Sequence, residues 1–493
     1  MKLRDLLAGA DVIEITGDSE IDISALAYDS RQVVEGALFF CVPGYSSDGH
    51  AYAPLAVQAG ATAVVVERPV ELASGVVQAR VVSARAAMAH AAVRFYSDPS
   101  RQLRVVGITG TNGKTTTAFL VRQILEHAGI QTGLLGTVKQ VVGGVEEEVV
   151  RTTPEAIEMQ ATLSRMLAAG DRAAALEVSS HALRLSRVDG VRFAVAAFTN
   201  LTQDHLDFHA DMEDYFLAKR RLFEGDRPDR AVINLDDPYG DRLAVEFDAT
   251  TFSACGDERA DIRALDVAFD ASGSRFRCIT PTAEADVVLP LPGRFNVENA
   301  LCALASTAAL GIELDQIVAA LAGADRVPGR FEPIDEGQPF AVFVDYAHTP
   351  DSLENVLVAA RQITTPGNGL ICVFGCGGDR DRDKRPLMGE IAARLADVAI
   401  ITSDNPRSED PLAIIEEIRD GTTAADAAAQ IETEPDRRAA IARALALATA
   451  GDTVVIAGKG HEQGQEFEHG KKNPFDDRDV AREELLALAV SRP

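Results

Sequence analysis

A glycine-rich loop at residues 110–116 constrains the fold of this chain more than any other stretch. Three apolar residues, Val105, Val106 and Ile108, precede it and predict a short buried strand. An amphipathic pattern from 118 to 128 follows it and predicts a helix. A loop between a strand and a helix N-terminus can turn backbone N–H groups toward phosphate oxygens, so this stretch predicts a polyphosphate site.

The expected contacts are spread along the loop. Lys114 would bring a full positive charge to the phosphates, and Thr115 a hydroxyl for magnesium. The usual spacing places a glycine where this chain has Ile108, and the glycines here are Gly107 and Gly110. A glycine turn can also be purely structural, but the flanking strand and helix favour nucleotide binding. The residues expected to bind ATP through the loop are Gly110, Thr111, Asn112, Gly113, Lys114, Thr115 and Thr116.

Length and charge limit the classes of protein that fit. A chain of 493 residues is too long for one compact domain, and roughly two to four are expected. The formal net charge of −27 argues against a nucleic-acid-binding surface. The N-terminus lacks an apolar signal core and no apolar run is long enough to span a membrane. The six cysteines form no CxxC pair, so we expect reduced thiols, a cytoplasmic location and no membrane insertion.

Three α/β units are expected along the chain. The first covers residues 1–99, the second covers 100–328 and holds the glycine loop, and the third covers 329–493. In the third unit, apolar strands alternate with helical stretches, which predicts a mostly parallel, doubly wound sheet. Its expected strands are 340–344, 370–374, 398–401 and 453–456.

Polar residues follow two strands expected in the second unit. The apolar run 173–176 leads to Glu177, and the run 193–198 leads to a polar segment that contains His205. Phosphate-loop folds hold magnesium at such strand ends. Because a carboxylate there often only caps a helix, the nearby glycine loop is what favours a metal-binding role.

The four strands expected in the third unit also end in polar residues beside glycines. The segments are 345–350, 375–382, 404–407 and 458–462. Ligands of such sheets bind at the carboxyl ends of the strands, so the segments predict one crevice for a small zwitterion or anion.

Several motifs together resemble the Mur ligase family, over essentially the whole length. They are Thr-Gly-Thr-Asn-Gly-Lys-Thr-Thr (109–116), Leu-Glu-Val-Ser-Ser-His (176–181), Asp-His-Leu-Asp (204–207), Gly-Arg-Phe-Asn-Val-Glu-Asn (293–299), Gly-Arg-Phe-Glu (329–332) and Asp-Tyr-Ala-His-Thr-Pro (345–350). This set is far more specific than the glycine loop alone. Asp-Asn-Pro-Arg (404–407) is similar to the signature of members that add meso-2,6-diaminopimelate rather than lysine.

The resemblance implies an ATP-driven amide ligation in peptidoglycan precursor synthesis. The D-glutamyl carboxylate of UDP-N-acetylmuramoyl-L-alanyl-D-glutamate would attack the γ-phosphate of ATP. The amine of meso-diaminopimelate would then attack the resulting acyl phosphate. It also implies an N-terminal uridine-nucleotide domain, a central P-loop ATPase-like domain and a C-terminal Rossmann-like domain.

By the same resemblance, magnesium is the cofactor and ATP a cosubstrate. Thr115 and Glu177 would hold one magnesium ion, and His205 and a carbamylated Lys219 a second. Carbamylation turns the lysine into an anion that can face a metal. Without the family context, Lys219 would be a solvated lysine in the basic run 219–221. The expected catalytic residues are Lys114, His205 and Lys219.

The remaining site residues are assigned to three ligands by the resemblance. Adenine and ribose would meet Asn296, Arg330 and Asp345. The uridine substrate would meet Ser30, Tyr45, Ser46, Ser47, Thr152, Thr153, Ser179 and Arg187. Diaminopimelate would meet Arg380, Asp404, Asn405, Pro406, Arg407, Gly458 and Glu462.

Arg407 carries the expected choice of amino acid. Diaminopimelate differs from lysine by a carboxylate on the carbon that bears the distal amine, and a guanidinium can grip both of its oxygens. Glu462 and the Gly458 carbonyl would take the ammonium. For residues 404–407 alone, a turn with an exposed arginine is the simpler interpretation, and the other strand ends favour a binding site.

Three alternatives remain at this point. One is a lysine-adding ligase of the same family. Another is a ligase like folylpolyglutamate synthetase, which shares the phosphate loop but is disfavoured because the first unit fits a uridine nucleotide. A phosphate-loop switch or binding module would hardly need four charged strand ends in a separate unit. We expect the chain to act as a monomer.

Overall fold

The computed structural model describes residues 1–44, 47–225, 228–423 and 429–491. The chain divides into two compact units, of which the first holds residues 1–109, 128–197 and 218–231 and the second holds residues 110–127, 198–217 and 232–493. The expected domain boundaries at 99 and 328 stay a prediction. In the described part of the chain, no helix has the length and apolar character needed to cross a membrane.

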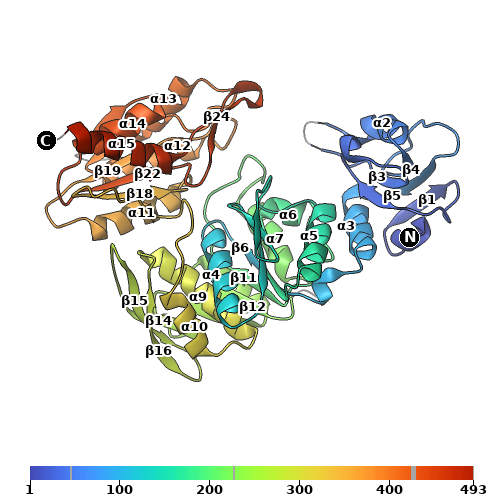
Figure 1. Cartoon of the computed structure of the whole chain (residues 1–493), viewed down its shortest axis with the longest axis horizontal. Helices are drawn as coiled ribbons and strands as arrows, with labels where there is room; N and C mark the ends of the chain where they lie inside the picture. The colour runs from blue at the N-terminus through green and yellow to red at the C-terminus, as the bar shows by residue number, and fades with distance from the viewer. Residues whose placement is uncertain (45–46, 226–227, 424–428, 492–493) are drawn as a thin grey trace. The chain divides into compact units, whose positions relative to one another are not determined.

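The N-terminal part of the first unit is a sheet with strand order β1-β5-β4-β3-β2 (Figure 1). Its elements are α1 (Leu3–Leu6), β1 (Val12–Thr16), β2 (Ala25–Ala27), β3 (Ala37–Phe40), α2 (Ala53–Gln58), β4 (Ala61–Val66), β5 (Val77–Val81) and α3 (Ala84–Phe95). Leu38, Phe40 and Val65 pack in a cluster with α3, whereas Phe39 and Val64 pack in a cluster with α2. Strand β1 runs antiparallel to β5.

The rest of the first unit carries strands in the order β6-β10-β7-β8-β9. Its elements are β6 (Arg104–Thr109), β7 (Thr132–Leu135), β8 (Gln140–Val142), β9 (Val145–Glu147), α5 (Ala156–Ala168), β10 (Ala173–Glu177) and α6 (Ser180–Arg184). Strand β10 runs parallel to β6 and places Glu177 opposite Ile108. As predicted, Glu177 therefore stands at the carboxyl end of a buried strand, level with the end of β6.

The second unit begins with α4, directly after the glycine loop. Its elements up to residue 322 are α4 (Lys114–His127), α8 (Pro238–Glu246), β13 (Ala249–Ser253), β14 (Ile262–Asp270), β15 (Gly273–Ile279), β16 (Glu284–Leu289), α9 (Arg294–Ala309) and α10 (Leu314–Ala322). Strands β14, β15 and β16 form an antiparallel meander. Three elements cross the limits of the units along the chain: β11 (Val195–Phe198), α7 (Met212–Arg220) and β12 (Ala231–Asn234).

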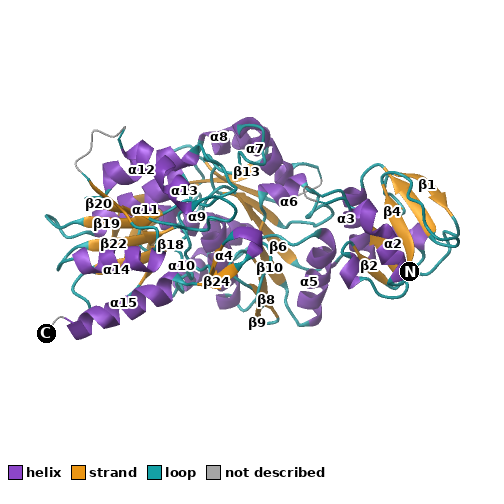
Figure 2. Cartoon of the chain, turned by 90° about the horizontal axis from the view of Figure 1, so that it is seen from above, coloured by secondary structure: helices purple, strands orange, loops and turns teal. Residues whose placement is uncertain are grey.

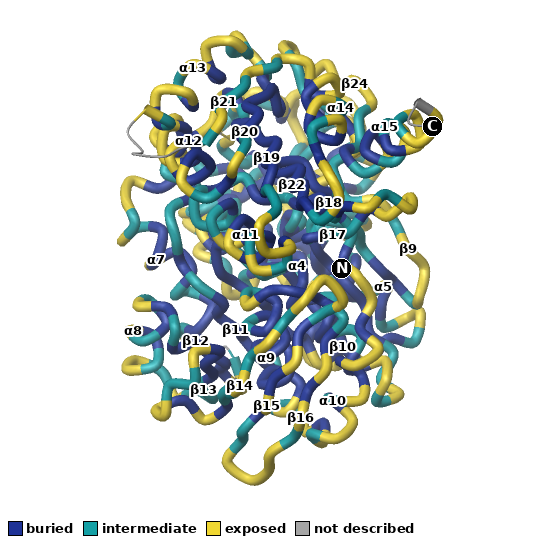
Figure 3. The backbone as a smooth tube through the Cα atoms, turned by 90° about the vertical axis from the view of Figure 1, so that its left-hand side faces the viewer, coloured by how far each residue is buried: buried dark blue, intermediate teal, exposed yellow. Residues whose placement is uncertain are grey.

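The C-terminal part of the second unit is a sheet with strand order β17-β18-β22-β19-β20-β21. Its strands are β17 (Glu332–Pro333), β18 (Ala341–Asp345), β19 (Leu370–Phe374), β20 (Val398–Ile401), β21 (Gln430–Thr433) and β22 (Thr453–Ala457). The described neighbours run parallel except β17 and β18. Strands β19 and β22 are buried along their whole length (Figure 3). The predicted doubly wound sheet is confirmed.

Helices cover both faces of this sheet, as Figure 2 shows. The helices are α11 (Pro350–Ile363), α12 (Lys384–Leu395), α13 (Pro411–Thr422), α14 (Arg437–Leu447) and α15 (Asp477–Ser491). Leu357, Met388 and Ile418 from α11, α12 and α13 pack in one cluster with Cys372, while α14 and α15 pack in another with Ile371. A small hairpin, β23 (Gly464–Glu466) and β24 (Lys472–Pro474), follows β22.

Arg437 and Asp477 tie α14 and α15 to the end of β22. Both side chains are 0% exposed. Arg437 donates from Nε and Nη2 to the two Asp477 oxygens at 2.7 and 2.6 Å, and from Nη2 to the Ala457 carbonyl at 2.9 Å. This ion pair therefore fixes the layer of helices behind the strand end.

Asp477→Ala should lower the free energy of unfolding by about 3–5 kcal/mol, because it leaves a buried guanidinium without its carboxylate. Urea denaturation measures this loss. The matched control is Glu483→Ala, which removes an exposed partner of Arg438 between the same two helices and should change stability little. Equal losses in the two variants would contradict this interpretation of the buried pair.

Candidate active site

The glycine loop requires glycine at two positions. Gly110 and Gly113 have φ angles of +152° and +86°. A Cβ atom at Gly110 would lie 1.9 Å from Thr199 Oγ1, and one at Gly113 would lie 2.2 Å from Asn299 Oδ1. Side chains are therefore excluded at both positions, because the loop packs directly against Thr199 and Asn299.

The segment that follows β11 holds this loop in place. Asn200 accepts N–H bonds from Asn112 at Oδ1 (2.8 Å) and from Thr111 at its carbonyl (2.9 Å). Thr199 Oγ1 donates to the Asn112 carbonyl at 2.6 Å, and Thr202 N–H donates to Thr111 Oγ1 at 3.0 Å. Residues 199–202, which begin the polar segment expected after this run of apolar residues, therefore position the glycine loop.

Two cations lie on the loop. Lys114 Nζ donates to the carbonyls of Gly110 and Thr111 at 2.8 and 2.7 Å. Arg330 Nη2 donates to Thr115 Oγ1 at 2.9 Å, and its Cζ atom lies 4.5 Å from the centre of the Tyr346 ring. Lys114 and Arg330 thus bring two positive charges to the glycine loop at the N-terminus of α4, where a bound anion would be favoured.

A cavity beside the loop contains several residues expected to bind ATP. Its lining includes Asn112, Gly113, Thr116, Arg330 and Asp345. Asp345 accepts the N–H groups of Phe331 at 2.6 Å and Ala347 at 2.7 Å, which ties two loops together. Burial raises the pKa of Asp345 to about 6, although Arg330 and these N–H groups act in the opposite direction.

Asn296 is not in the lining of this cavity. It is buried, and its Nδ2 donates to the Pro292 carbonyl at 2.9 Å, before the start of α9. Phe295, Glu298 and Asn299 from the same helix line the cavity instead. A role of Asn296 in adenine binding stays a prediction.

A second cavity lies at the carboxyl ends of β18, β19, β20 and β22. Of the predicted residues, its lining includes His205, Arg380, Asp404, Asn405, Arg407, Gly458 and Glu462. Pro406 is not in the lining, and its carbonyl would lie 2.0 Å from a Cβ atom at Gly378. We name this the amino-acid cavity; it lies at the predicted crevice.

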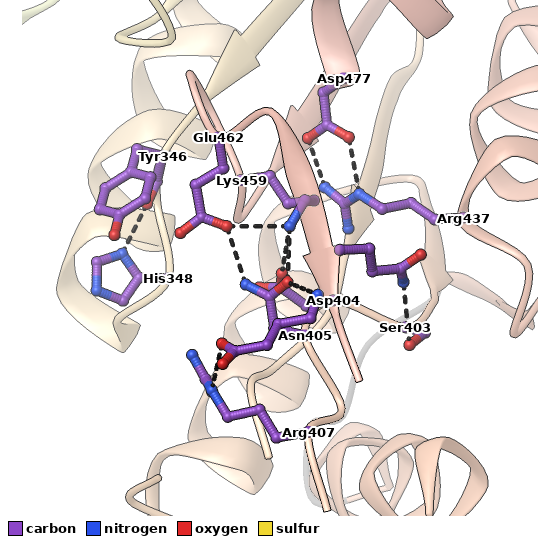
Figure 4. Close-up of polar contacts among 12 residues, drawn as sticks. Tyr346, His348, Ser403, Asp404, Asn405, Arg407, Arg437, Lys459, Glu462 and Asp477 are labelled. Atoms are coloured by element: carbon purple, nitrogen blue, oxygen red, sulfur yellow. Dashed lines mark hydrogen bonds and ion pairs between the residues drawn. The ribbon is translucent and has the colours of Figure 1, made fainter. Parts of the chain in front are cut away.

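A buried lysine organises one wall of the amino-acid cavity (Figure 4). Lys459, 0% exposed, donates from Nζ to Asn405 Oδ1 at 2.9 Å and to Glu462 Oε2 at 3.0 Å. Asp404 Oδ1 lies 3.5 Å from the same ammonium. Asn405 Nδ2 donates to Glu462 Oε2 at 2.9 Å. The network fixes the orientation of the Asn405 amide and of the Glu462 carboxylate.

The amino-acid cavity also contains residues that were not assigned from the sequence. Tyr346 and His348 line both cavities, and His348 Nδ1 lies 2.7 Å from the Tyr346 carbonyl. Lys384, at the start of α12, is buried in the lining. Tyr346 and His348 belong to the segment 345–350, which was expected at the end of a strand. Their position at a strand end could therefore have identified them as site residues. Lys384 lies on a helix and carries no such signal.

His205 faces the amino-acid cavity beside a buried carboxylate. Its Nε2 lies 3.4 Å from Asp204 Oδ2. Burial would raise the pKa of Asp204, but the charges of His205, His348 and Lys384 outweigh it and hold that pKa below its usual range. The backbone of His205 has φ +55°, a conformation uncommon for a residue with a side chain.

Four residues expected to bind the uridine substrate come together in the first unit. Thr153 Oγ1 donates to the Glu177 carbonyl at 2.8 Å and lies 3.4 Å from Ser179 Oγ. Arg187 Nη1 donates to the Thr153 carbonyl at 3.3 Å. Thr152 Oγ1 lies 3.1 Å from Thr137 Oγ1. These residues therefore form a polar cluster at the end of β10, in which Thr153 is buried.

The other residues assigned to the uridine substrate lie on loops of the N-terminal sheet. Ser30 begins a short 3₁₀ turn that the Asp29 side chain caps. Ser47 is exposed, and Tyr45 and Ser46 lie outside the described residues. In the described part of the chain, neither Ser30 nor Ser47 forms a hydrogen bond with the residues around Thr153.

The expected metal ligands belong to different units, Thr115 and His205 to the second and Glu177 and Lys219 to the first. Among the described residues, no group of three or more His, Cys, Asp or Glu side chains could by itself hold a metal ion. Glu177 accepts the N–H and the hydroxyl of Thr137 at 2.7 and 2.9 Å. Lys219 is 1% exposed, which excludes the interpretation as a solvated lysine.

Three models of Mur ligase domains match most of this chain, one after another. Residues 22–106 match the model of the Mur ligase family, catalytic domain, residues 108–307 the Mur ligase middle domain, and residues 329–460 the Mur ligase, glutamate ligase domain. The match to the first model includes the part of the chain that was expected to recognise a uridine nucleotide.

Two similar proteins and one solved structure have the same name. A UDP-N-acetylmuramoyl-L-alanyl-D-glutamate--2,6-diaminopimelate ligase of Gloeobacter violaceus is 48% identical and covers 98% of this chain and of its own. That of Geobacillus kaustophilus is 46% identical and covers 98% of this chain and 99% of its own. A solved structure of a ligase with the same name is 33% identical, with a TM-score of 0.69 and 99% of each chain covered.

Proposed function

The chain belongs to the Mur ligase family, and we propose that it joins meso-2,6-diaminopimelate to UDP-N-acetylmuramoyl-L-alanyl-D-glutamate at the expense of ATP. The relatives of that name support the proposal over nearly the full length. The observation that carries it is the amino-acid cavity, where Arg407, Asn405 and Glu462 meet at the carboxyl ends of parallel strands. The fold has the three-domain architecture of the family.

The first half of the reaction uses the glycine loop. A free carboxylate is a poor acylating agent because its oxygen is a poor leaving group. Transfer of the γ-phosphoryl group to that oxygen allows it to leave as phosphate. The D-glutamyl carboxylate attacks the γ-phosphorus, ADP leaves, and an acyl phosphate forms. Lys114 and Arg330 neutralise phosphate charge, and the fixed loop supplies backbone N–H groups.

The second half uses the amino-acid cavity. The amine of diaminopimelate loses a proton and attacks the acyl carbon, and inorganic phosphate leaves with the former carboxylate oxygen. Tyr346 and His348 line both cavities, so the 346–348 segment is where the two halves of the reaction come close. Positioning of the two reactants supplies much of the rate acceleration.

The distal end of diaminopimelate carries a carboxylate and an ammonium. Arg407 offers a guanidinium to the carboxylate, while Glu462, fixed by Lys459 and Asn405, offers an oxygen to the ammonium. Lysine would leave Arg407 without its anionic partner. A site built to bind a polar group rejects an analogue that lacks it by roughly 10⁴-fold or more.

Magnesium is the cofactor that the donor groups fit, because hydroxyl and carboxylate oxygens are the ligands it prefers. Thr115 and Glu177 would hold one ion, and His205 and a carbamylated Lys219 a second. Such ions would offset the negative charge of the phosphates. The modification is what the resemblance to the family implies for Lys219, whose side chain is buried rather than solvated.

The uridine substrate is proposed to bind in the first unit. Thr152, Thr153, Ser179 and Arg187 form its polar surface, with Ser30 and the 45–47 loop on the N-terminal sheet. The six cysteines are thiols, which supports a cytoplasmic location. Action as a monomer is part of the same proposal.

The alternatives differ in what they require. A lysine-adding ligase would not need an arginine at position 407, and a folylpolyglutamate synthetase would not need a uridine-nucleotide domain. A nucleotide switch would turn over ATP without the amino acid and the uridine substrate. Steady ADP release that depends on both cosubstrates separates a ligase from a switch.

The test of amino-acid choice is kcat/KM for meso-diaminopimelate and for L-lysine. The wild type should prefer diaminopimelate, and Arg407→Ala should lose most of that preference, because the guanidinium makes the difference between the two substrates. Arg382→Ala is the control, since Arg382 is exposed and pairs with Glu417. Equal use of both amino acids by the wild type, or an unchanged preference in Arg407→Ala, would refute the assignment.

The test of Lys219 is chemical rescue. Lys219→Ala should be nearly inactive, and a short carboxylate such as acetate should restore part of the activity by replacing the carbamate oxygens. Lys139→Ala, which removes a lysine from an ion pair with Glu146, should keep full activity. An unmodified lysine in a high-resolution crystal structure of a fully active preparation with bicarbonate would count against carbamylation.

A further inference from the structure

Arg407 is held from outside the amino-acid cavity by the β23–β24 hairpin. Glu466, the last residue of β23, accepts the Nε–H of Arg407 at 2.9 Å through Oε2. The backbone N–H of Arg407 donates to the Glu466 carbonyl at 3.1 Å, and Arg407 forms a parallel bridge with Phe467. Glu466 is not in the lining of the cavity, whereas Arg407 is.

The guanidinium is fixed at two of its three nitrogens. Nε is bound to Glu466, and Nη1 donates to the Gly378 carbonyl at 2.7 Å. A guanidinium has five N–H groups in one plane, so the two N–H groups of Nη2 and the second N–H of Nη1 remain as donors. Within the described residues, no hydrogen bond from Nη2 of Arg407 to a protein acceptor is present. The fixed nitrogens therefore determine where the remaining donors point.

The same hairpin is connected to the ammonium end of the site. The Glu466 N–H donates to Asn405 Oδ1 at 2.9 Å, the oxygen that also accepts from Lys459. With two donors on its oxygen, the Asn405 amide must present Nδ2 to Glu462. The backbone of Glu466 thus holds Asn405 at the end proposed to bind the ammonium, and its side chain holds Arg407 at the end proposed to bind the carboxylate.

We propose that Glu466 is a positioning residue that sets amino-acid specificity by orienting the Arg407 guanidinium. The inference rests on the proposed function, because it concerns how Arg407 recognises the distal carboxylate. Arg407 has a left-handed backbone (φ +52°) and a long side chain with many rotamers. Without the Glu466 carboxylate, the Gly378 carbonyl would be the one acceptor left for the guanidinium among the described residues.

Loss of the Glu466 carboxylate should weaken the binding of the distal carboxylate of the substrate and leave the binding of its other groups unchanged. A bidentate bond between a guanidinium and a carboxylate is directional, so rotation of the guanidinium weakens it. L-Lysine has no distal carboxylate and should be unaffected. LL-Diaminopimelate has the same groups as the meso isomer but the opposite configuration at the distal carbon, so the ratio between the two isomers reports orientation rather than charge.

The experiment compares kcat and KM of wild type, Glu466→Ala and Glu466→Gln for meso-diaminopimelate, LL-diaminopimelate and L-lysine. Glu466→Ala should raise KM for the meso isomer by about 10- to 100-fold at similar kcat, and lower the preference for meso over LL. Glu466→Gln keeps an acceptor for Nε–H and should lie closer to the wild type. Glu468→Ala is the matched control, because Glu468 is an exposed residue of the same hairpin.

A double variant tests whether Glu466 acts through Arg407. If it does, adding Glu466→Ala to Arg407→Ala should change kcat/KM for meso-diaminopimelate little further. An unchanged KM and isomer ratio in Glu466→Ala would overturn the inference. So would equal losses for diaminopimelate and L-lysine, which would make the hairpin merely structural.

Failure of the proposed function has a different signature. In that case the wild type itself would show no preference for meso-diaminopimelate over L-lysine, or Arg407→Ala would keep the preference. A third result is that the wild type prefers meso-diaminopimelate over L-lysine and over the LL isomer, Arg407→Ala loses these preferences, and Glu466→Ala keeps them. In that case the proposed function stands and only the inference about Glu466 is wrong.

Discussion

A buried ammonium group must have acceptors around it, and the amino-acid site depends on this requirement at Lys459. The side chain is 0% exposed at the end of β22, where Asn405 and Glu462 accept its hydrogen bonds and Asp404 lies close. These partners come from the ends of two parallel strands, so pairing one charge also fixes the geometry of the site. The substrate then meets groups whose positions the protein has already determined, which reduces the cost of ordering them on binding.

The 346–348 segment links this geometry to ATP. It follows directly from β18, and Tyr346 contributes to both cavities while its ring lies under the Arg330 guanidinium. Arg330 in turn bonds Thr115 on the nucleotide side. The proposed nucleotide and amino-acid sites therefore share one wall, as a reaction that passes an activated acyl group to an amine requires.

The sequence was sufficient to predict which residues lie at the ends of the strands. It was not sufficient to predict in which direction their side chains point. Asp404, Asn405, Arg407 and Glu462 could be predicted to meet because parallel strands collect the residues at their carboxyl ends. The β14–β16 meander was not predicted, since β15 turns Ser274 inward with Phe276 and Cys278, and a buried serine interrupts the apolar alternation. Asn296 and Asn299 lie one turn apart, and spacing alone does not tell which of them lines the cavity. Lys384 was missed because a lysine at a helix start usually lies in solvent.

In the proposed reaction, the acyl phosphate forms on the D-glutamyl carboxylate before the amine attacks. The most direct test of this order labels the oxygens of that carboxylate with a heavy isotope and follows them by mass spectrometry after one turnover with ATP and meso-diaminopimelate. One labelled oxygen should appear in the released inorganic phosphate and the other in the new amide. Inorganic phosphate without label would contradict this order.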